Sequence, residues 1–168
     1  MNAETGRAAQ VDLDRLRRVF REHGLRLTHQ RIELYGIVVT DPGHPTVEAV
    51  FRRAQETLPT VSLDTVYRTL SLFEEMGLIA RVHPLDPTVR YDPNPAPHHH
   101  LVCRRCHTIV DFDWPQIDEM EPPVPDAAWG SVERRRVEIW GLCRRCAQAQ
   151  QDHSPPGNRR ARSTNRLA

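Results

Sequence analysis

Residues 98–107 read HHHLVCRRCH, and this stretch decides how the C-terminal half of the chain folds. Imidazoles and thiols predominate in it, and both are good ligands for soft or borderline metals. A second Cys-x-x-Cys pair, Cys143 and Cys146, follows the pair of Cys103 and Cys106. Each pair places two thiolates on one side of a tight knuckle, so the two together predict a closed four-sulfur zinc site. Such a site would contribute directly to folding; the alternative is four free or disulfide-bonded cysteines.

The three histidines of this stretch indicate a second site, because the four thiolates already complete the first one. In an extended segment alternate side chains point the same way, so His98 and His100 are expected to share a face, with His99 turned away. Two imidazoles need further ligands to hold a metal, and Asp92 and Asp111 flank the segment on either side. Nitrogen and carboxylate ligands of this kind suit Fe(II), Mn(II) or Zn(II).

Upstream of this stretch the apolar residues recur with the period of a helix, and four helices are expected. The first begins near residue 11 and stops at Gly24, and the second is capped by Thr28. The third is capped by Thr46, and the fourth opens at Ser62 and ends at Gly77. Short polar side chains before an apolar run are the usual start of a helix, and glycine is its usual end.

After Gly77 the pattern changes to that of strands. LIARV (78–82) and TVRYD (88–92) are short strand-like runs separated by HPLDP, which favours a hairpin. Several helices followed by a hairpin is the order of a winged helix-turn-helix, although any small α+β domain has the same order. Beyond the proline-rich linker at 92–97, further strands are expected at 100–102, 108–112 and 132–140.

The length of 168 residues suits one domain or two small lobes. The net charge is +1, so composition alone does not predict a nucleic-acid partner, although every basic residue is arginine. The N-terminus lacks the apolar core of a signal peptide, and no apolar run approaches the roughly 20 residues that span a bilayer. A cytoplasmic protein without a membrane partner is therefore expected, and its reduced thiols favour metal over disulfides.

Sequence signatures of catalysis are missing. The chain has no His-x-Glu of a zinc deaminase, no Gly-rich phosphate loop and no Gly-x-Ser-x-Gly elbow. An enzyme is therefore not expected. A metal-storage or interaction module that uses the same ligands without DNA is another alternative, and the helical half of the chain argues against it.

From about Leu13 to Cys146 the chain resembles the ferric uptake regulator superfamily of bacterial metal-dependent repressors. The segments that resemble it are GLRLTHQR (24–31), GHPT (43–46), VSLDTVYRTL (61–70), RYD (90–92), HHHLVCRRC (98–106), IVDF (109–112) and GLCRRC (141–146). The resemblance implies an α+β protein with structural zinc in its four cysteines. Its implied parts are a winged-helix DNA-binding domain over 11–92, a hinge over 93–97, an α/β dimerisation and metal-binding domain over 98–147, and a disordered tail over 148–168.

The resemblance also implies a mechanism in which a regulatory Fe(II) or Mn(II) bridges the two domains. His44 belongs to the DNA-binding domain, and on composition alone it is expected to be an ordinary turn residue. Metal closes the two lobes, which sets the recognition helices of a homodimer at the spacing of an A·T-rich operator with two-fold symmetry. The implied ligands of the regulatory metal are His44, Asp92, His98, His100 and Asp111.

The implied recognition helix spans residues 62–75. The implied DNA contacts are Arg26, Ser62, Thr65, Tyr67 and Arg68. Tyr67 is expected to pack on a thymine methyl, and Arg26 to enter a narrow A·T-rich minor groove, where negative potential is concentrated. The alternative for Tyr67 is a core aromatic, but the apolar face of its helix is complete without it, which favours exposure.

The residue at position 111, an aspartate, indicates which branch of the superfamily the chain resembles. By resemblance, iron-uptake regulators usually have glutamate at this place, whereas peroxide-sensing regulators resembling PerR have aspartate. In that branch iron reduces peroxide and the radical formed attacks the nearest imidazole, so that the oxidised protein loses iron and stops repressing. The candidates for oxidation are His44 and His98. We therefore expect a peroxide sensor, with an iron-uptake regulator as the alternative.

The chain departs from the superfamily pattern at three places. The dimerisation helix is expected to be shortened, because residues 114–130 are rich in proline. Arg135 stands where many members have a histidine for an extra metal site, so a third site is not expected, and Asp118 is at most acidic support. His107 replaces the usual glycine after the second cysteine and is expected to have no ligand role.

Overall fold

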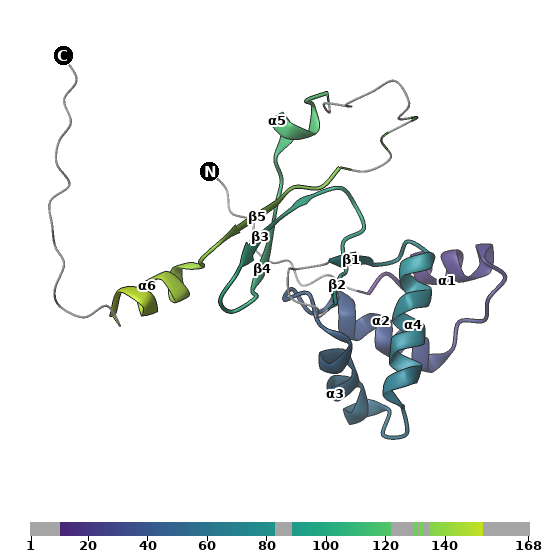
Figure 1. Ribbon diagram of the computed structural model, residues 1–168. Coiled ribbons are helices and arrows are strands. Elements are labelled where there is room, and N and C mark those ends of the chain that lie inside the picture. The colour runs from purple at the N-terminus through teal and green to yellow at the C-terminus, as the bar shows by residue number, and fades with distance from the viewer. Residues whose placement is uncertain (1–10, 83–88, 122–129, 131, 133–134, 153–168) are drawn as a thin grey trace, which may run out of the picture.

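The computed structural model describes residues 11–82, 89–121, 130, 132 and 135–152. Helices α1 to α4 and a two-stranded sheet form one lobe, and a three-stranded sheet with helices α5 and α6 forms the other (Figure 1). The α+β class and the order of helices, hairpin and second sheet that the sequence predicts are confirmed.

Each of the first four helices begins at a side chain that caps it. The side-chain oxygens of Asp12, Thr28, Thr46 and Ser62 each accept a hydrogen bond from the backbone N–H three residues further on. These bonds satisfy amides that have no partner within the first turn. After the fourth helix Gly77 adopts φ +65, a left-handed conformation that favours glycine. The helices are α1 (Leu13–Glu22), α2 (His29–Val39), α3 (Val47–Thr57) and α4 (Leu63–Glu75).

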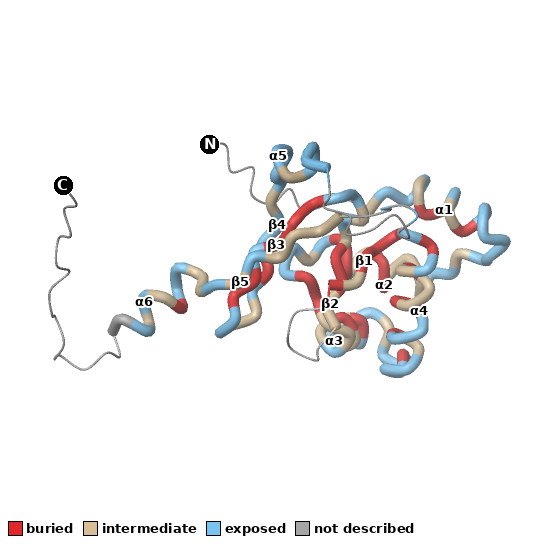
Figure 2. Tube along the Cα trace, turned by 45° about the horizontal axis from the view of Figure 1, so that its top comes forward, coloured by how far each residue is buried: buried red, intermediate tan, exposed pale blue. Residues whose placement is uncertain are grey.

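These helices enclose the larger of two apolar cores. Phe73 of α4 lies edge-on to Phe20 of α1 and to Tyr35 of α2, with ring centroids 6.2 and 5.6 Å apart. Buried segments gather between these helices in Figure 2. Strands β1 (Ala80–Val82) and β2 (Arg90–Asp92) form the antiparallel wing, and the fully buried Tyr91 joins the wing to this core.

The second lobe is built on β3 (His99–Cys103), β4 (Ile109–Phe112) and β5 (Glu138–Gly141), in the order β4-β3-β5. Strand β3 is antiparallel to β4 and parallel to β5. Among the described residues, the buried cluster here joins Val102 and Ile109 of the sheet to Val82 of β1, with Trp140 packed against it. A core of this size stabilises a lobe weakly, so other interactions must hold the sheet lobe together.

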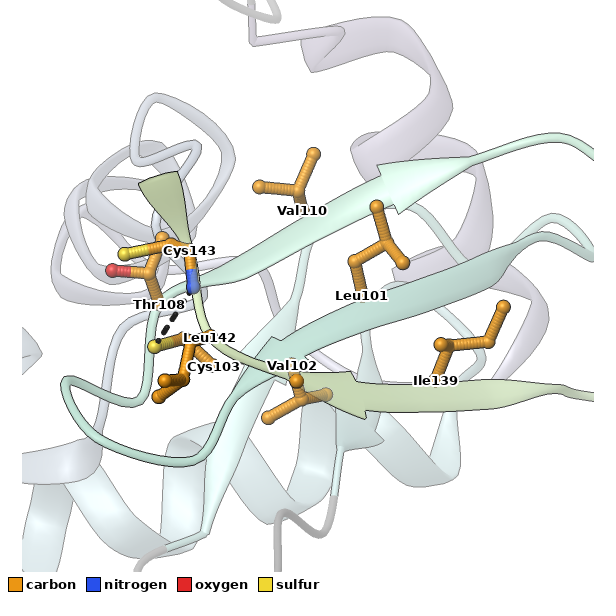
Figure 3. Close-up of a pocket in the computed structure, with 9 residues that line it drawn as sticks. Leu101, Val102, Cys103, Thr108, Val110, Ile139, Leu142 and Cys143 are labelled. Atoms are coloured by element: carbon orange, nitrogen blue, oxygen red, sulfur yellow. Dashed lines mark hydrogen bonds between the residues drawn. The ribbon is translucent and has the colours of Figure 1, made fainter. Parts of the chain in front are cut away.

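One face of this sheet presents a row of apolar side chains to solvent. Leu101 is paired with Val110 on one side and with Ile139 on the other, so the three lie across the sheet on one face (Figure 3). They are 43%, 48% and 40% exposed. We call this row the sheet strip.

Helices α5 (Pro115–Asp118) and α6 (Arg144–Asp152) complete the sheet lobe. A shortened dimerisation helix was expected within residues 114–130. In this segment the structure has α5, which is a single turn, and residues 122–129 lie outside the described residues. Residues 148–152 belong to α6, so the expected tail does not begin at 148; residues 153–168 lie outside the described part. Strand β5 begins at Glu138, later than the expected 132. Within the described ranges, every helix is too short or too polar to cross a membrane.

Candidate metal centres

In the part of the chain that the structure describes, two groups of side chains are arranged to hold a metal ion. The first group is Cys103, Cys106, Cys143 and Cys146, and the second is His44, Asp92, His98 and His100. Within each group the ligand atoms all lie within 4.8 Å of one another. The structure thus brings together the cysteines of the two knuckles, and it joins residues of both lobes in the second group.

The four thiols meet where β3 ends and α6 begins. The Sγ atoms of Cys106 and Cys143 are 3.7 Å apart, and a tetrahedron with Zn–S bonds of about 2.3 Å has edges of about 3.8 Å. The backbone N–H of Cys143 donates to Sγ of Cys103 at 3.4 Å (Figure 3), which holds one knuckle against the other. All four cysteines are free rather than disulfide-bonded. The group therefore fits a tetrahedral zinc.

Cys106 is the thiol best prepared to bind as a thiolate. Hydrogen bonds from the hydroxyl and the backbone N–H of Thr108 lower the pKa of Cys106 to about 5, with the hydroxyl 3.2 Å from its Sγ. Burial instead raises the pKa of Cys146 to about 12. Zinc displaces the protons of its thiol ligands, so binding to this group releases protons and weakens as pH falls.

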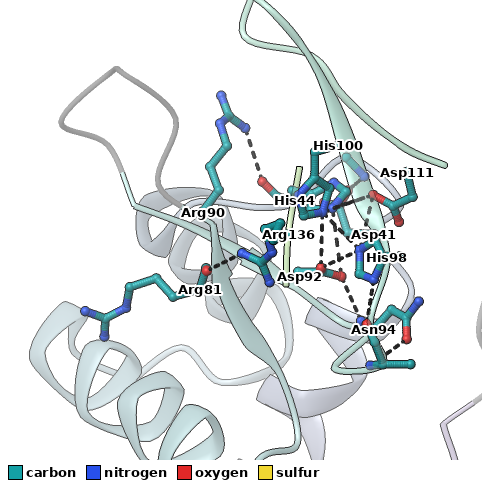
Figure 4. Close-up of polar contacts among 12 residues, drawn as sticks. Asp41, His44, Arg81, Arg90, Asp92, Asn94, His98, His100, Asp111 and Arg136 are labelled. Carbon is teal, nitrogen blue, oxygen red and sulfur yellow. Dashed lines mark hydrogen bonds and ion pairs between the residues drawn. The ribbon is translucent and has the colours of Figure 1, made fainter. Parts of the chain in front are cut away.

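The second group lies between the lobes (Figure 4). His44 comes from the loop before α3 and Asp92 from the end of β2, both in the helical lobe. His98 directly precedes β3, while His100 of β3 and Asp111 of β4 are direct partners across the ladder. Asp111 lies close enough to join the group: its Oδ1 is 2.9 Å from Nε2 of His44. The side chain of Asp111 is 42% exposed, whereas the other four residues are buried.

The spacing of these five side chains fits a single cation. Seven separations between their ligand atoms fall between 2.9 and 3.8 Å. Adjacent ligands on bonds of about 2.1 Å are about 3.0 Å apart in an octahedron and about 3.4 Å apart in a tetrahedron. Nε2 of His44 and Oδ2 of Asp92 are buried without a well-oriented hydrogen-bond partner. Such atoms are costly to bury, and one cation would satisfy both.

Hydrogen bonds prepare His98 to be a ligand. Its Nδ1 lies 2.7 Å from the carbonyl oxygen of Ala96, so Nδ1–H donates there and the neutral ring leaves Nε2 bare. That Nε2 faces Nε2 of His100 at 3.0 Å and Oδ2 of Asp92 at 2.9 Å. The Asp92 carboxylate favours a proton on this Nε2 and so raises the pKa of His98; a bound cation would take the place of that proton. Burial alone would raise the pKa of Asp92, but the close imidazoles of His100 and His98 and the hydrogen bond from the Asn94 amide outweigh it and lower this pKa well below its usual range.

The loop that presents His44 is held against the wing. His44 adopts φ 54, a left-handed conformation that costs a non-glycine residue about 1 kcal/mol. Nη1 of Arg90 donates to the carbonyl oxygen of His44 at 3.1 Å, and the backbone N–H of Tyr91 donates to that of Pro45 at 3.0 Å. Because Asp92 follows on the same strand, β2 positions both metal-facing residues of the helical lobe.

We expect Arg90→Gln to weaken Mn(II) binding about tenfold without changing the zinc content. The substitution removes the charged donor that keeps His44 in its left-handed conformation, and loss of such supporting bonds typically costs about 10- to 100-fold in metal affinity. Arg52→Gln is the matched control, because Arg52 is exposed on α3. Titration calorimetry with Mn(II) measures the affinities, and equal values for the two variants would contradict a positioning role of Arg90.

His99, expected to point away from the second group, has a structural role that the sequence did not indicate. It is fully buried: its Nδ1 accepts a bond from the backbone N–H of Val137 at 3.1 Å, and its Nε2 is 3.2 Å from Oδ1 of Asp118. Nη1 of Arg135 donates to the carbonyl oxygen of Asp118 at 3.1 Å. A guanidinium therefore occupies this end of α5. The absence of a third metal site stays a prediction.

The residues expected to contact DNA lie on α4, at its N-cap or in the loop before α2. Tyr67 is 49% exposed and lies outside the core, and Arg26 and Arg68 are exposed. The hydroxyls of Ser62 and Thr65 are 2.8 Å apart at the N-terminus of α4, where Ser62 caps the helix. Contact with DNA remains a prediction for all five residues.

Comparisons with known proteins agree with this architecture. The sequence profile described as the ferric uptake regulator family matches residues 22–139. The peroxide-responsive repressor PerR of Staphylococcus epidermidis is 31% identical over 128 residues, 76% of this chain and 85% of that protein. A solved zinc-bound manganese uptake regulator is 32% identical, with a TM-score of 0.60 over 76% of this chain and 98% of that one. The Helicobacter pylori ferric uptake regulator, at 22% identity, shares the fold with a TM-score of 0.70 over 85% of this chain and 97% of that one.

Proposed function

Because this chain belongs to the ferric uptake regulator family, we propose that it is a metal-dependent transcriptional repressor that senses peroxide, with Fe(II) or Mn(II) as corepressor and structural zinc in the four cysteines. The observation that supports this most is the group of three histidines and two aspartates that joins the lobes. Proteins of this family regulate transcription.

The metal acts by favouring one arrangement of the lobes. His44 and Asp92 belong to the helical lobe, and His98, His100 and Asp111 to the sheet lobe. Without a cation the two carboxylates repel each other across this boundary, whereas one bound cation attracts both. Metal binding therefore shifts the population toward the closed arrangement.

In the closed arrangement a homodimer places its two α4 helices in successive major grooves of an A·T-rich inverted repeat. Tyr67 and Arg68 face the bases and Arg26 the minor groove. The sheet strip of Leu101, Val110 and Ile139 supports dimerisation, because an exposed apolar row on a lobe with a small core is stabilised by a second copy.

Peroxide ends repression by changing the histidine ligands. Fe(II) held by these residues would give an electron that breaks the oxygen–oxygen bond and would recover it from the ring, so hydrogen peroxide is the net two-electron oxidant. One oxygen atom of the peroxide is added to an imidazole carbon of His44 or His98, and the other oxygen leaves as water. The oxidised ring is a poorer ligand, so the protein no longer holds the lobes closed. The exposed side chain of Asp111 supports this proposal, because it leaves one side of the group open to a small oxidant.

The test is peptide mass spectrometry on protein loaded with Fe(II) without oxygen and then given a small dose of hydrogen peroxide. We expect a gain of one oxygen on peptides with His44 or His98, and none with Mn(II), which does not reduce peroxide in this way. The peptide with His29, outside the group, is the internal control. Unmodified His44 and His98 in a protein that holds its iron would contradict peroxide sensing and leave an iron-responsive repressor as the function.

A further inference from the structure

One hydrogen bond joins the two lobes beside the histidine group. Nη1 of Arg136, just before β5, donates to the carbonyl oxygen of Arg81 in β1 at 3.1 Å (Figure 4). Arg136 belongs to the sheet lobe and Arg81 to the wing of the helical lobe. Hydrogen bonds from a charged donor are among the stronger ones in proteins, and this one is partly buried. The bond itself needs no cation, so it favours the same arrangement of the lobes that the metal favours.

Both ends of this bond lie next to ligands of the histidine group in the two sheets. The residue that precedes Arg81 is the ladder partner of Asp92. The residue that follows Arg136 is Val137, and its carbonyl oxygen accepts a hydrogen bond from the backbone N–H of His100 at 3.0 Å. The bond therefore joins the strand pair that carries Asp92 to the strand pair that carries His100.

The acceptor strand is also fixed to α4, the helix proposed to read DNA. Nη2 of Arg81 forms an ion pair with Oε2 of Glu74, in the last turn of α4, at 2.6 Å. The same guanidinium lies over the ring of the fully buried Tyr91, 5.9 Å from its centroid. Strand β1 and helix α4 thus hold each other in place, so a contact that positions β1 also positions α4.

Apolar packing accompanies the hydrogen bond across the boundary. Val82 of β1 is fully buried and belongs to the same cluster as Val102 of β3 and Ile109 of β4. Apolar burial is non-directional, so it brings the lobes into contact without deciding their relative position. A hydrogen bond weakens steeply when it is misaligned, so the bond of Arg136 selects one position.

We propose that Arg136 is a positioning residue of the regulatory metal site, which sets the ligands of one lobe against those of the other and lowers the metal concentration at which the lobes close. The proposal rests on the regulatory metal site of the proposed function. When only part of a protein population has the binding-competent arrangement, its apparent affinity falls by that fraction. The bond of Arg136 raises this fraction, and the metal affinity rises with it. Arg90 acts differently, because it holds His44 within one lobe.

The test compares Arg136→Met with Arg104→Met in the full-length zinc protein, with Mn(II) affinity measured by titration calorimetry. Methionine keeps an apolar stem but has no donor, and Arg104 is an exposed arginine of the same lobe. We expect Arg136→Met to bind Mn(II) about tenfold more weakly than wild type, at the lower end of the effect of losing a hydrogen bond to a charged group. Arg104→Met should bind like wild type, and Arg136→Lys, which can still donate, should recover most of the affinity.

Two further measurements separate positioning from a general structural effect. Small-angle X-ray scattering during the Mn(II) titration follows the closure of the lobes. In Arg136→Met this change should require about tenfold more Mn(II) but reach the same end value as in wild type. The electron paramagnetic resonance spectrum of Mn(II) at saturation should also equal that of wild type, because the ligands are unchanged.

The possible failures of this inference can be told apart. Equal Mn(II) affinities of Arg136→Met and Arg104→Met, at full zinc content, would overturn the role of Arg136 and leave the metal site intact. Loss of zinc from Arg136→Met, or a changed spectrum of its bound Mn(II), would also overturn it, because the substitution would then damage the lobe or the ligand set. A wild-type protein that binds neither Mn(II) nor Fe(II) would instead contradict the metal site of the proposed function, and the role of Arg136 with it.

Discussion

Cys143→Ser is expected to lose zinc and, with it, the cooperative unfolding of the sheet lobe. Among the described residues, the apolar cluster of this lobe contains two buried side chains of its own, Val102 and Ile109, packed with Val82 of the wing, so hydrophobic burial contributes little there. Zinc binding to cysteine knuckles releases about 10–16 kcal/mol in small zinc domains, and that free energy is folding free energy. Differential scanning calorimetry should show loss of the transition of the sheet lobe, and metal analysis should show loss of zinc.

The helical lobe provides an internal reference for this experiment. Its core includes Leu16, Phe20, Leu70 and Phe73 and contains no cysteine, so its own transition should remain in Cys143→Ser. Arg144→Ser is the matched control, because it introduces the same residue at the neighbouring exposed position. A Cys143→Ser protein that unfolds like Arg144→Ser and retains zinc would show that the four cysteines do not support the lobe.

Asp92→Asn is expected to weaken Mn(II) or Fe(II) binding by at least about 100-fold while leaving the zinc content unchanged, because loss of a ligand should cost at least as much as loss of a supporting bond. Asp92 is fully buried, and its carboxylate faces His44, His98 and His100 at 2.9–3.8 Å. The amide keeps the shape of the side chain but removes the charge that balances a divalent cation. Titration calorimetry measures the affinity directly.

Thermal unfolding gives a second readout of the same substitution. At Mn(II) concentrations 100 times the dissociation constant, binding stabilises the wild type by about 2.7 kcal/mol, and Asp92→Asn should show almost none of this gain. Asp113→Asn is the matched control, because Asp113 is an exposed acid just past β4. If Mn(II) stabilised Asp92→Asn as much as Asp113→Asn, Asp92 would not be a ligand of the regulatory metal.

The helices of the first lobe were predictable because their ends are decided locally. Thr28, Thr46 and Ser62 each cap the helix that the sequence assigned to them, and Gly77 adopts the left-handed conformation expected at a helix end. Such bonds join residues that are three apart, so the residues close to one another in the sequence are enough to predict them. The start of β5 was placed too early, because its position depends on pairing with β3, which is distant in the chain.

The two candidate metal sites also differ in how far the sequence alone predicts them. The spacing within Cys103 and Cys106 already requires two thiols on one side of a knuckle, so the sequence could predict this site by itself. His44 carried no such signal: only the resemblance pointed to it, and the structure places its Nε2 2.9 Å from Asp111. The buried role of His99 was missed because three consecutive histidines do not show which of them turns toward α5.

The sequence by itself determined the helices of the first lobe and the two Cys-x-x-Cys pairs. Their members lie within a few residues of one another, where short-range sterics and hydrogen bonds decide the structure. It also determined that His98 and His100 face the same way, since alternate side chains of an extended segment do so. Only the tertiary structure decided that the wing carries Asp92 to these histidines, that Arg90 holds His44 beside them, and that Arg105 of one knuckle donates to the backbone of the other. These contacts join segments far apart in the chain, and the packing of one lobe against the other fixes their distances, which no local pattern contains.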